Sequence, residues 1–480
     1  MACIRSLQPK IGTGRYKRTA RIFKQCCGYP PASPRIALKS TGKKSMTHLR
    51  ASRSILFVVA IICLILSACS NLEAARYQRQ AEQFLAEGKL PEAVLTYRQA
   101  LASDPENPEI LRGLGMTLAA QGRQRSAARF LGRAIEIDPN DTSAKDALAS
   151  LTTRPQNGLS LQLAWVVEAS ESELVGAAVA SGRIFVVYTD GQLTALDQTT
   201  GQVMWKTKAP VGLVSPPSAD SGQVWVGAEN GTIYIYDAKS GDQLGTFATG
   251  GAVYAAPALT SDTAYCPSND GELYAVNRAT VEMKWKAEVG EALHVSPLVS
   301  GQAIYVGSVN GRLYGFNAST GERLWTYGIL TQGAVESIPT LVNERLFFGS
   351  GDGRVYALDA ETGGEYWRFS TPDAVYAQPL AWNDQIIVAS SGQMLASVQF
   401  ADGSPTWSLS FDGPITGTPV LFKGRLFLFT RGNPRLFAVD PQTGKLLGEL
   451  NTGDWLTFNP LVAGDDIILI GQDGSVLLYR

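Results

Sequence analysis

From residue 161 to residue 480, one arrangement of apolar and polar positions returns about every 40 residues. Each copy holds short apolar runs separated by turn dipeptides; in one copy they read HVSPLV, AIYVGS, RLYGFN and ERLWTY. Dipeptides such as Asn-Gly and Thr-Gly suit tight hairpins, because glycine adopts positive φ without a steric penalty. Each copy therefore predicts a meander of four β-strands.

Recurring marker residues keep this repeat in register. A turn glycine returns at steps of 39 to 42 residues, with Pro434 in its place once: Gly191, Gly231, Gly271, Gly311, Gly353, Gly392 and Gly474. A tryptophan follows most of these turns, and Gly245 and Gly448 replace it in two copies. Four-stranded meanders of this period are typical of β-propeller blades, and eight copies predict eight blades.

The two ends of the repeated segment complement each other. The last copy stops at Arg480, before its tryptophan strand, whereas an extra Trp165 in LQLAWVVE lies 40 residues before Trp205. We expect the N-terminal strand to complete the eighth blade, because a closed ring leaves no sheet edge exposed.

The segment ALDQTTGQVMW resembles the tryptophan-docking motif of quinoprotein-type (PQQ-like) propellers. Its Ala, Asp, Gly and Trp stand at the same spacing at residues 195–205 and 357–367. The resemblance implies that each indole packs against the neighbouring blade. Physical chemistry agrees, because an indole buries a large area where alanine leaves room for it. The expected blade-docking residues are Trp165, Trp205, Trp285, Trp325, Trp367 and Trp407.

Residues 73–151 follow a helical pattern instead. Alanine and leucine recur at helical spacing, and Pro105 and Pro139 stand 34 residues apart, the period of tetratricopeptide repeats. The pattern resembles that family over roughly residues 74–139, and residues 141–150 are expected to form a capping helix. Small residues at inner positions let paired helices approach closely: Ala81, Ala93, Gly115 and Ala127. The sequence leaves open whether these repeats bind a peptide or act as a spacer.

The predicted fold class is therefore multidomain. A short all-α tetratricopeptide segment with its capping helix (73–151) precedes a polar linker, TTRPQNGLS (152–160). An all-β eight-bladed propeller (161–480) follows.

The N-terminal region differs sharply from this body in charge. Residues 1–68 hold 13 Lys or Arg and no acidic residue, leaving 29 basic against 43 acidic residues in the rest of the chain. An acidic body argues against nucleic acid as a partner. Within the basic region, twelve apolar residues, 55–66, are too short to span a bilayer comfortably and predict a secretory signal.

The end of that apolar run resembles the lipobox of bacterial lipoproteins. The residues are Leu66-Ser67-Ala68-Cys69, and the resemblance implies that Cys69 is lipidated and anchors the chain to a membrane. The alternative is a short membrane anchor that ends in cysteine. Residues 1–45 precede Met46 and are interpreted as an over-long start assignment or a transit-like leader. Resemblance to other lipoproteins implies the outer membrane, facing the periplasm, because Ser70 is not an Asp-type retention signal. In a cell without an outer membrane, it implies the outer face of the cytoplasmic membrane.

Candidate binding residues precede the prolines that open the innermost strands, where a propeller lines its channel. They are Tyr254, His294, Glu336, Tyr376, Gln378 and Asn459. After residue 69 the chain has one histidine, His294, and one cysteine, Cys266, which supports neither a disulfide, a thiolate metal site nor a catalytic triad. We expect no catalytic residue, no metal and no cofactor.

The run from VGEALHVSPLVSG to GAVESIPTLV (289–343) resembles the outer-membrane β-barrel assembly lipoproteins of the BamB family. The resemblance implies a non-catalytic, lipid-anchored envelope scaffold that binds other envelope proteins, with the β-barrel assembly machinery as the candidate partner. The sequence departs from that family in two ways. It has Ala334-Val335 where the family's docking loop carries an Arg shortly before Glu-Ser, and it adds the tetratricopeptide segment.

The alternative function is a quinone- or carbohydrate-binding propeller, including a PQQ-dependent dehydrogenase-like protein. Such enzymes insert long segments between strands to build the cofactor chamber. Here the period varies only from 39 to 42 residues, which favours the scaffold.

Overall fold

A computed structural model describes residues 72–151, 159, 161–167, 172–328, 333–415 and 417–480. The expectations for the leader and signal peptide (1–68), for Cys69 and for most of the linker (152–160) lie outside the described residues. Within the described part of the chain, no helix combines the length and the apolar character needed to cross a membrane.

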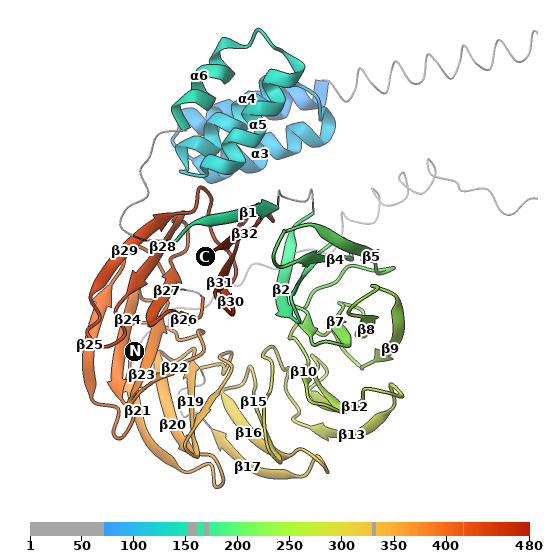
Figure 1. Ribbon diagram of the computed structural model, residues 1–480, viewed down its shortest axis with the longest axis vertical. Coiled ribbons are helices and arrows are strands. Elements are labelled where there is room, and N and C mark those ends of the chain that lie inside the picture. Colours follow the sequence, from blue (N-terminus) through green and yellow to red (C-terminus); the bar gives the residue numbers. More distant parts are fainter. Residues whose placement is uncertain (1–71, 152–158, 160, 168–171, 329–332, 416) are drawn as a thin grey trace, which may run out of the picture. The chain divides into compact units, whose positions relative to one another are not determined.

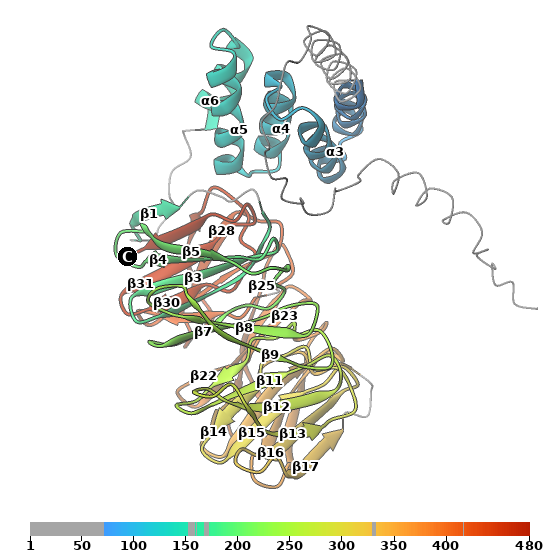
Figure 2. The same ribbon diagram turned by 90° about the vertical axis from the view of Figure 1, so that its right-hand side faces the viewer.

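The predicted all-α segment is confirmed. Residues 72–86 are helical and precede four further helices, which stand in a row in Figure 2: α3 (Leu90–Ser103), α4 (Pro108–Ala120), α5 (Gln124–Ile137) and α6 (Thr142–Leu151). Close packing between them depends on glycine. A Cβ atom on Gly113 would lie 2.7 Å from the Tyr97 ring, and one on Gly115 would lie 2.7 Å from Leu131. The small inner residues therefore let α3, α4 and α5 interlock.

Caps fix where the helices begin. The Asn107 side chain accepts hydrogen bonds from the amides of Glu109 and Ile110 at 3.1 and 3.2 Å at the start of α4. Asp141 does the same for α6 through the Ala144 amide at 2.9 Å, and its other oxygen pairs with Arg112 of α4 at 2.8 Å. The capping helix is thus tied to the preceding repeat.

The predicted eight-bladed propeller is also confirmed: the strands of the described residues form eight four-stranded sheets. Blades 1 to 4 are β2–β5 (Leu174–Ala180, Arg183–Tyr188, Gln192–Asp197, Val203–Lys208), β6–β9 (Ser218–Ala219, Gln223–Gly227, Thr232–Asp237, Gln243–Ala248), β10–β13 (Ala258–Leu259, Thr263–Pro267, Glu272–Asn277, Met283–Glu288) and β14–β17 (Leu298–Ser300, Ala303–Gly307, Arg312–Asn317, Arg323–Gly328). Blades 5 to 8 are β18–β21 (Thr340–Val342, Arg345–Ser350, Arg354–Asp359, Glu365–Ser370), β22–β25 (Leu380–Trp382, Gln385–Ser390, Met394–Gln399, Pro405–Ser410), β26–β29 (Val420–Phe422, Arg425–Phe429, Arg435–Val439, Leu446–Asn451) and β30–β32 with β1 (Leu461–Ala463, Asp466–Ile470, Val476–Tyr479, Leu163–Val167).

Each blade is an antiparallel meander whose first strand lies nearest the centre of the ring (Figure 1). The connections between blades and the turns between second and third strands therefore share one end of the strands, here called the upper end. The turns between first and second strands, and between third and fourth strands, lie at the opposite, lower end. The middle strands are buried along most of their length, whereas the fourth strands alternate exposed and half-buried residues.

The ring closes as the position of Trp165 predicts. Strand β1 pairs antiparallel with β32, so residues from both ends of the repeated segment share one blade. Gln162 and Arg480 extend this pairing, because the amide of each donates to the carbonyl of the other at 3.0 Å.

A tryptophan joins most pairs of adjacent blades. Each indole N–H donates to a carbonyl of the following blade at 3.0 to 3.3 Å: Trp165 to Gln198, Trp205 to Ala238, Trp285 to Ala318, Trp325 to Ala360, Trp367 to Phe400 and Trp407 to Pro441. A glycine of the following blade lies against each ring, and a Cβ atom there would come within 2.4 to 2.8 Å of it: Gly201, Gly241, Gly321, Gly363, Gly403 and Gly444. The turn glycine thus leaves room for the preceding blade's indole.

Blade 2 shows what replaces the indole. Gly245 stands at the tryptophan position, and Val281 of blade 3 stands at the position of the turn glycine, with φ of 60°. A Cβ on Gly245 would lie 3.3 Å from a Val281 methyl group. The residue paired across the strands with Gly245 is Ile235, whereas Ala195 pairs with Trp205 in blade 1. Larger aliphatic side chains thus stand on both sides of the missing ring.

We predict that Gly403→Ala costs more stability than Gly182→Ala. Both glycines have φ of +73°, so an alanine at either position pays about 1 kcal/mol for the left-handed backbone. Only at Gly403 would the new Cβ meet an indole, at 2.6 Å from Trp367, whereas nothing lies within 4 Å at Gly182. Overpacking should add about 1–3 kcal/mol at Gly403. Denaturant unfolding of both variants measures the difference, and equal losses would contradict the packing role of Gly403.

Candidate functional site

Equivalent upper-end loops of blades 3 to 6 carry four of the predicted channel residues. Tyr254, His294, Glu336 and Tyr376 each lie three residues before the proline that opens the first strand of the blade. The side chains are partly open to solvent: Tyr254 and Tyr376 are 39 and 44% exposed, and His294 and Glu336 are 37 and 35% exposed. Consecutive blades thus present them in sequence along one end of the propeller.

Three of the four residues meet around His294. The ring nitrogen Nε2 lies 2.9 Å from Oδ1 of Asn269, which stands in the turn between β11 and β12. Nδ1 lies 3.6 Å from Oε1 of Glu336 on the next blade. Tyr254 of the preceding blade packs edge-on, with ring centroids 5.8 Å apart and an interplanar angle of 86°. Each ring nitrogen of His294 therefore faces an oxygen atom, and the cluster spans three blades.

The other two predicted channel residues, Gln378 and Asn459, form hydrogen bonds between adjacent blades. The Gln378 amide donates to Oγ1 of Thr418, and its side-chain nitrogen donates to Oγ1 of Thr340, at 3.0 and 3.1 Å. Asn459 accepts from the Thr418 amide at 2.8 Å. These bonds connect the inner parts of blades 5 to 8, so Gln378 and Asn459 are separate from the His294 cluster.

Two further observations bear on the chemistry of the described residues. Among them, no group of three His, Cys, Asp or Glu side chains is placed to hold a metal ion. Cys266 is buried, and burial raises the pKa of its thiol far above the ordinary range, so the thiolate is disfavoured. The His294 cluster offers one tyrosine ring, an imidazole and a carboxylate to a docking molecule.

Sequence reasoning missed a second polar cluster, which joins the helical repeats to blade 8. Arg123, immediately before α5, pairs with Asp454 at 2.8 Å, and the two side chains are only 4 and 0% exposed. Ser126 donates its amide and hydroxyl to the same carboxylate and its hydroxyl also to Asp473. The Arg123 guanidinium lies 5.4 Å from the Trp455 ring. Removing one partner of such a buried pair costs about 3–5 kcal/mol, because the other charge is left uncompensated.

The surrounding charges support this junction. Burial alone disfavours ionisation of Asp473, but hydrogen bonds from Ser475 and the positive charges of Arg125 and Arg129 hold its pKa below the ordinary value. The Arg125 amide also donates to the Gly453 carbonyl at 2.6 Å. A sequence signal was available: four arginines within eleven residues, at positions 123, 125, 129 and 133, concentrate positive charge at the start of α5 and along it.

Both clusters occupy the upper end of the propeller. Asp454 follows β29 in the connection to blade 8, and Asp473 lies in the turn between β31 and β32. These are the same classes of loop that carry His294 and Asn269 in blades 3 and 4. The helical repeats therefore contact the end of the strands that also presents the tyrosines.

Comparison with known families covers nearly all of the described body. The model of the family described as "Beta-alanine-activating enzyme, beta-propeller" matches residues 167–477, and a tetratricopeptide-repeat model matches residues 84–151. No curated protein matches the chain significantly.

Solved structures show similar propellers at low sequence identity. BamB from Moraxella catarrhalis superposes with a TM-score of 0.58 at 16% identity, covering 67% of this chain and 99% of that one. The computationally designed Ika8 protein gives 0.59 at 16% identity, covering 66 and 99%. Quinohemoprotein alcohol dehydrogenase from Comamonas testosteroni gives 0.56 at 14% identity, covering 67 and 76%. At these identities the likeness shows the fold alone.

Proposed function

The chain belongs to the propeller family described as "Beta-alanine-activating enzyme, beta-propeller", and we propose that this member is a protein-docking scaffold without catalytic activity. The observation that carries this proposal is the row of upper-end side chains from Tyr254 to Tyr376, with the His294–Glu336 pair between the two exposed tyrosines. Aromatic side chains that are partly exposed and held by a rigid framework are frequent anchors of protein interfaces.

The helical repeats support the same reading. Tetratricopeptide repeats form arrays of helices, and such arrays present extended surfaces to partners. The buried Arg123–Asp454 pair ties this array to blade 8 at the end of the propeller that carries the tyrosines. A partner can therefore contact helices and propeller loops together, which raises affinity when both contacts form at once.

The cellular setting is part of the proposal. We propose that the chain is a lipoprotein of the cell envelope, anchored through Cys69, with other envelope proteins as partners. The charge, apolar and small-residue order of residues 50–69 supports the anchor. The resemblance of residues 289–343 to the BamB family supports the β-barrel assembly machinery as the first partner to test. The absence of that family's arginine before Glu336 means that the docking contacts must differ.

A second candidate function is the binding of a quinone or a carbohydrate at the ring. The likeness to quinohemoprotein alcohol dehydrogenase is the observation that favours it. A bound quinone would distinguish this candidate from the scaffold directly, because it absorbs visible or near-ultraviolet light. A bound carbohydrate has no such absorbance and would show instead as a rise in melting temperature when the sugar is added.

We predict that Cys69→Ser releases the protein from the membrane. Cells producing the full chain should incorporate a labelled fatty acid into it, and the protein should sediment with membranes. The Cys69→Ser variant should carry no label and remain soluble, because no acyl chain is attached. Labelling of both forms would contradict lipidation at this residue, whatever the role of the propeller.

We predict that the double variant Tyr254→Ala/Tyr376→Ala loses its envelope partner while remaining folded. Crosslinking in intact cells, followed by quantitative recovery of the β-barrel assembly proteins, measures the interaction. Loss of two interface tyrosines should reduce recovery at least tenfold. The melting temperature should change little, because both rings are more than a third exposed.

The matched control is Leu244→Ala, which removes a side chain 50% exposed on the fourth strand of blade 2. It should leave recovery unchanged. Equal recovery with the tyrosine variant and the wild type would contradict the proposed docking surface. A chromophore that copurifies with the protein and is lost on unfolding would favour the second candidate instead.

A further inference from the structure

Polar side chains fill the grooves between blades at the lower end of the propeller. Arg345, the first residue of β19, reaches from blade 5 to blade 6 and donates to the carbonyls of Phe400 and Ala401 at 3.1 and 3.0 Å. Its guanidinium lies 4.2 Å from the centroid of the Tyr366 ring. Gln223 at the equivalent position of blade 2 donates to the Arg278 carbonyl of blade 3 at 3.0 Å. One long polar residue thus bridges each of these junctions.

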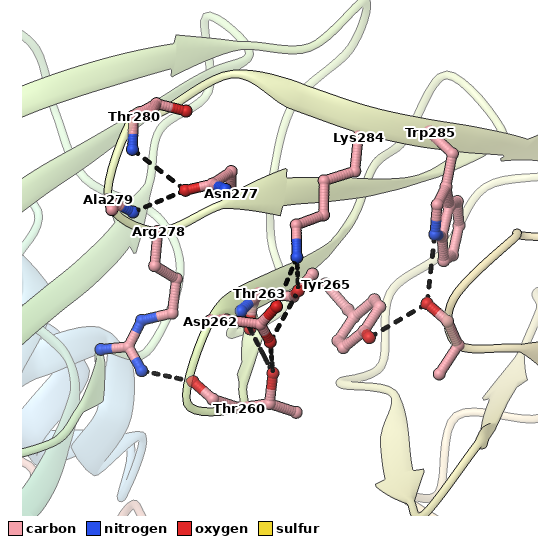
Figure 3. A network of polar contacts seen from close by, with 11 residues as sticks. Thr260, Asp262, Thr263, Tyr265, Asn277, Arg278, Ala279, Thr280, Lys284 and Trp285 are labelled. Carbon is pink, nitrogen blue, oxygen red and sulfur yellow. Dashed lines mark hydrogen bonds and ion pairs between the residues drawn. The ribbon is translucent and has the colours of Figure 1, made fainter.

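Blade 3 fills its groove in another way, which Figure 3 shows. Thr263 occupies the first position of β11, and Lys284 reaches it from β13 with a contact of 2.6 Å to its hydroxyl and 2.6 Å to Asp262. Nearby, Tyr265 and Trp285 both donate to the Ala318 carbonyl of blade 4 at 3.1 Å. The small first residue is compensated by a lysine from the fourth strand.

The groove between blades 4 and 5 lacks both kinds of filling. The first residue of β15 is Ala303, and Leu324 stands where blade 3 has Lys284. A groove of about 600 Å³ results, lined by Ala303, Tyr305, Leu324 and Leu341 among others. The corresponding groove of blade 7, where Arg425 takes the place of Ala303, measures about 120 Å³. A volume of 600 Å³ lies in the range of ligand-binding sites.

The lining of this blade 4–5 groove is acidic. Glu344, Asp359 and Glu361 line it, and none of its lining residues is Lys or Arg. Asp359 is held in the ionised form, because hydrogen bonds from Thr362 and Tyr366 keep its pKa below the ordinary value. Glu344 and Glu361 are exposed turn residues on the rim. The groove therefore combines an apolar wall with negative charge.

We infer that the blade 4–5 groove binds an arginine side chain presented by an extended segment of a partner protein. In this chain, Arg345 shows how an arginine lies in an equivalent groove, and Ala303 leaves the same space empty of such a side chain. The stem of the guest covers Leu324 and Leu341, while its planar guanidinium donates to the rim carboxylates. Arg345 donates to two backbone carbonyls of the next blade, those of Phe400 and Ala401. In the blade 4–5 groove, the Ala360 carbonyl already accepts a hydrogen bond from Tyr305 at 3.1 Å, so the rim carboxylates serve as the acceptors for the guest guanidinium.

This inference goes beyond the docking surface proposed above. The groove lies at the lower end of the strands and His294 lies at the upper end, so the two surfaces are tested by different variants and can fail separately.

The test is calorimetric titration of the purified full chain with the blocked tripeptide acetyl-Ala-Arg-Ala-amide. Citrulline in place of arginine keeps the shape and removes the charge, and should weaken binding at least tenfold. Spermidine serves as a second probe, because a groove made for any cation would bind it as well as the arginine peptide.

Ala303→Arg should abolish peptide binding with no loss in melting temperature, because Arg345 and Arg425 occupy the same place in their own blades. The double variant Glu344→Gln/Glu361→Gln should weaken binding at least tenfold, and it gives an independent readout if Ala303→Arg folds poorly. Arg425→Ala is the control: it opens a groove that includes Lys423 and has no acidic lining residue, so it should create no second site.

Several results would overturn the inference. These are equal binding of the citrulline peptide or spermidine, undiminished binding by Ala303→Arg, and the absence of heat from the arginine peptide at millimolar concentration. Loss of envelope partners in the Tyr254→Ala/Tyr376→Ala variant with intact peptide binding would leave the groove standing and separate it from the upper surface.

Discussion

The contact between an indole of one blade and a glycine of the next is the constraint on which this propeller depends. A blade alone is a small sheet with two apolar faces, and it is stable only when both faces are covered by neighbours. The indole covers part of that area, and its N–H donates a hydrogen bond to a carbonyl of the neighbouring blade, as Trp367 does to Phe400 at 3.1 Å. Because a Cβ under the ring would lie within 2.8 Å of it, the partner position must be glycine. The recurring spacing of glycine and tryptophan in the sequence results from this contact.

This glycine and tryptophan spacing explains how much of the fold can be predicted from the sequence alone. Tryptophan and glycine positions report packing directly, so the eight blades and the closing strand at Trp165 follow from the spacing. The exceptions do not follow, because they depend on which residue of the next blade faces a gap. Val281 fills the place beside Gly245 from another repeat, and Asn269 reaches His294 from a turn 25 residues earlier. The junction between Arg123 and Asp454 joins residues 331 apart, and no local pattern pairs them.

The candidate sites arise where the regularity stops. At the upper end, equivalent backbone positions of four consecutive blades carry Tyr254, His294, Glu336 and Tyr376, so the ring places these side chains along one edge. At the lower end, Ala303 and Leu324 leave open a groove whose equivalents are bridged by Gln223 in blade 2 and by Arg345 in blade 5. The sequence could point to the first group through its position before the prolines. It could not point to the groove, because alanine is common in strands and its meaning depends on knowing that most equivalent positions hold arginine or glutamine.

The most direct measurement is to build the missing indole contact into the joint between blades 2 and 3. Three changes recreate the motif there: Gly245→Trp, Ile235→Ala and Val281→Gly. The single Gly245→Trp variant should lose about 2 kcal/mol or more in free energy of unfolding, because Ile235 and Val281 obstruct the ring. The triple variant should recover that loss and reach at least wild-type stability, with a coupling energy of about 2 kcal/mol. Losses that simply add across the three changes would contradict the indole–glycine contact as the unit that holds the ring together.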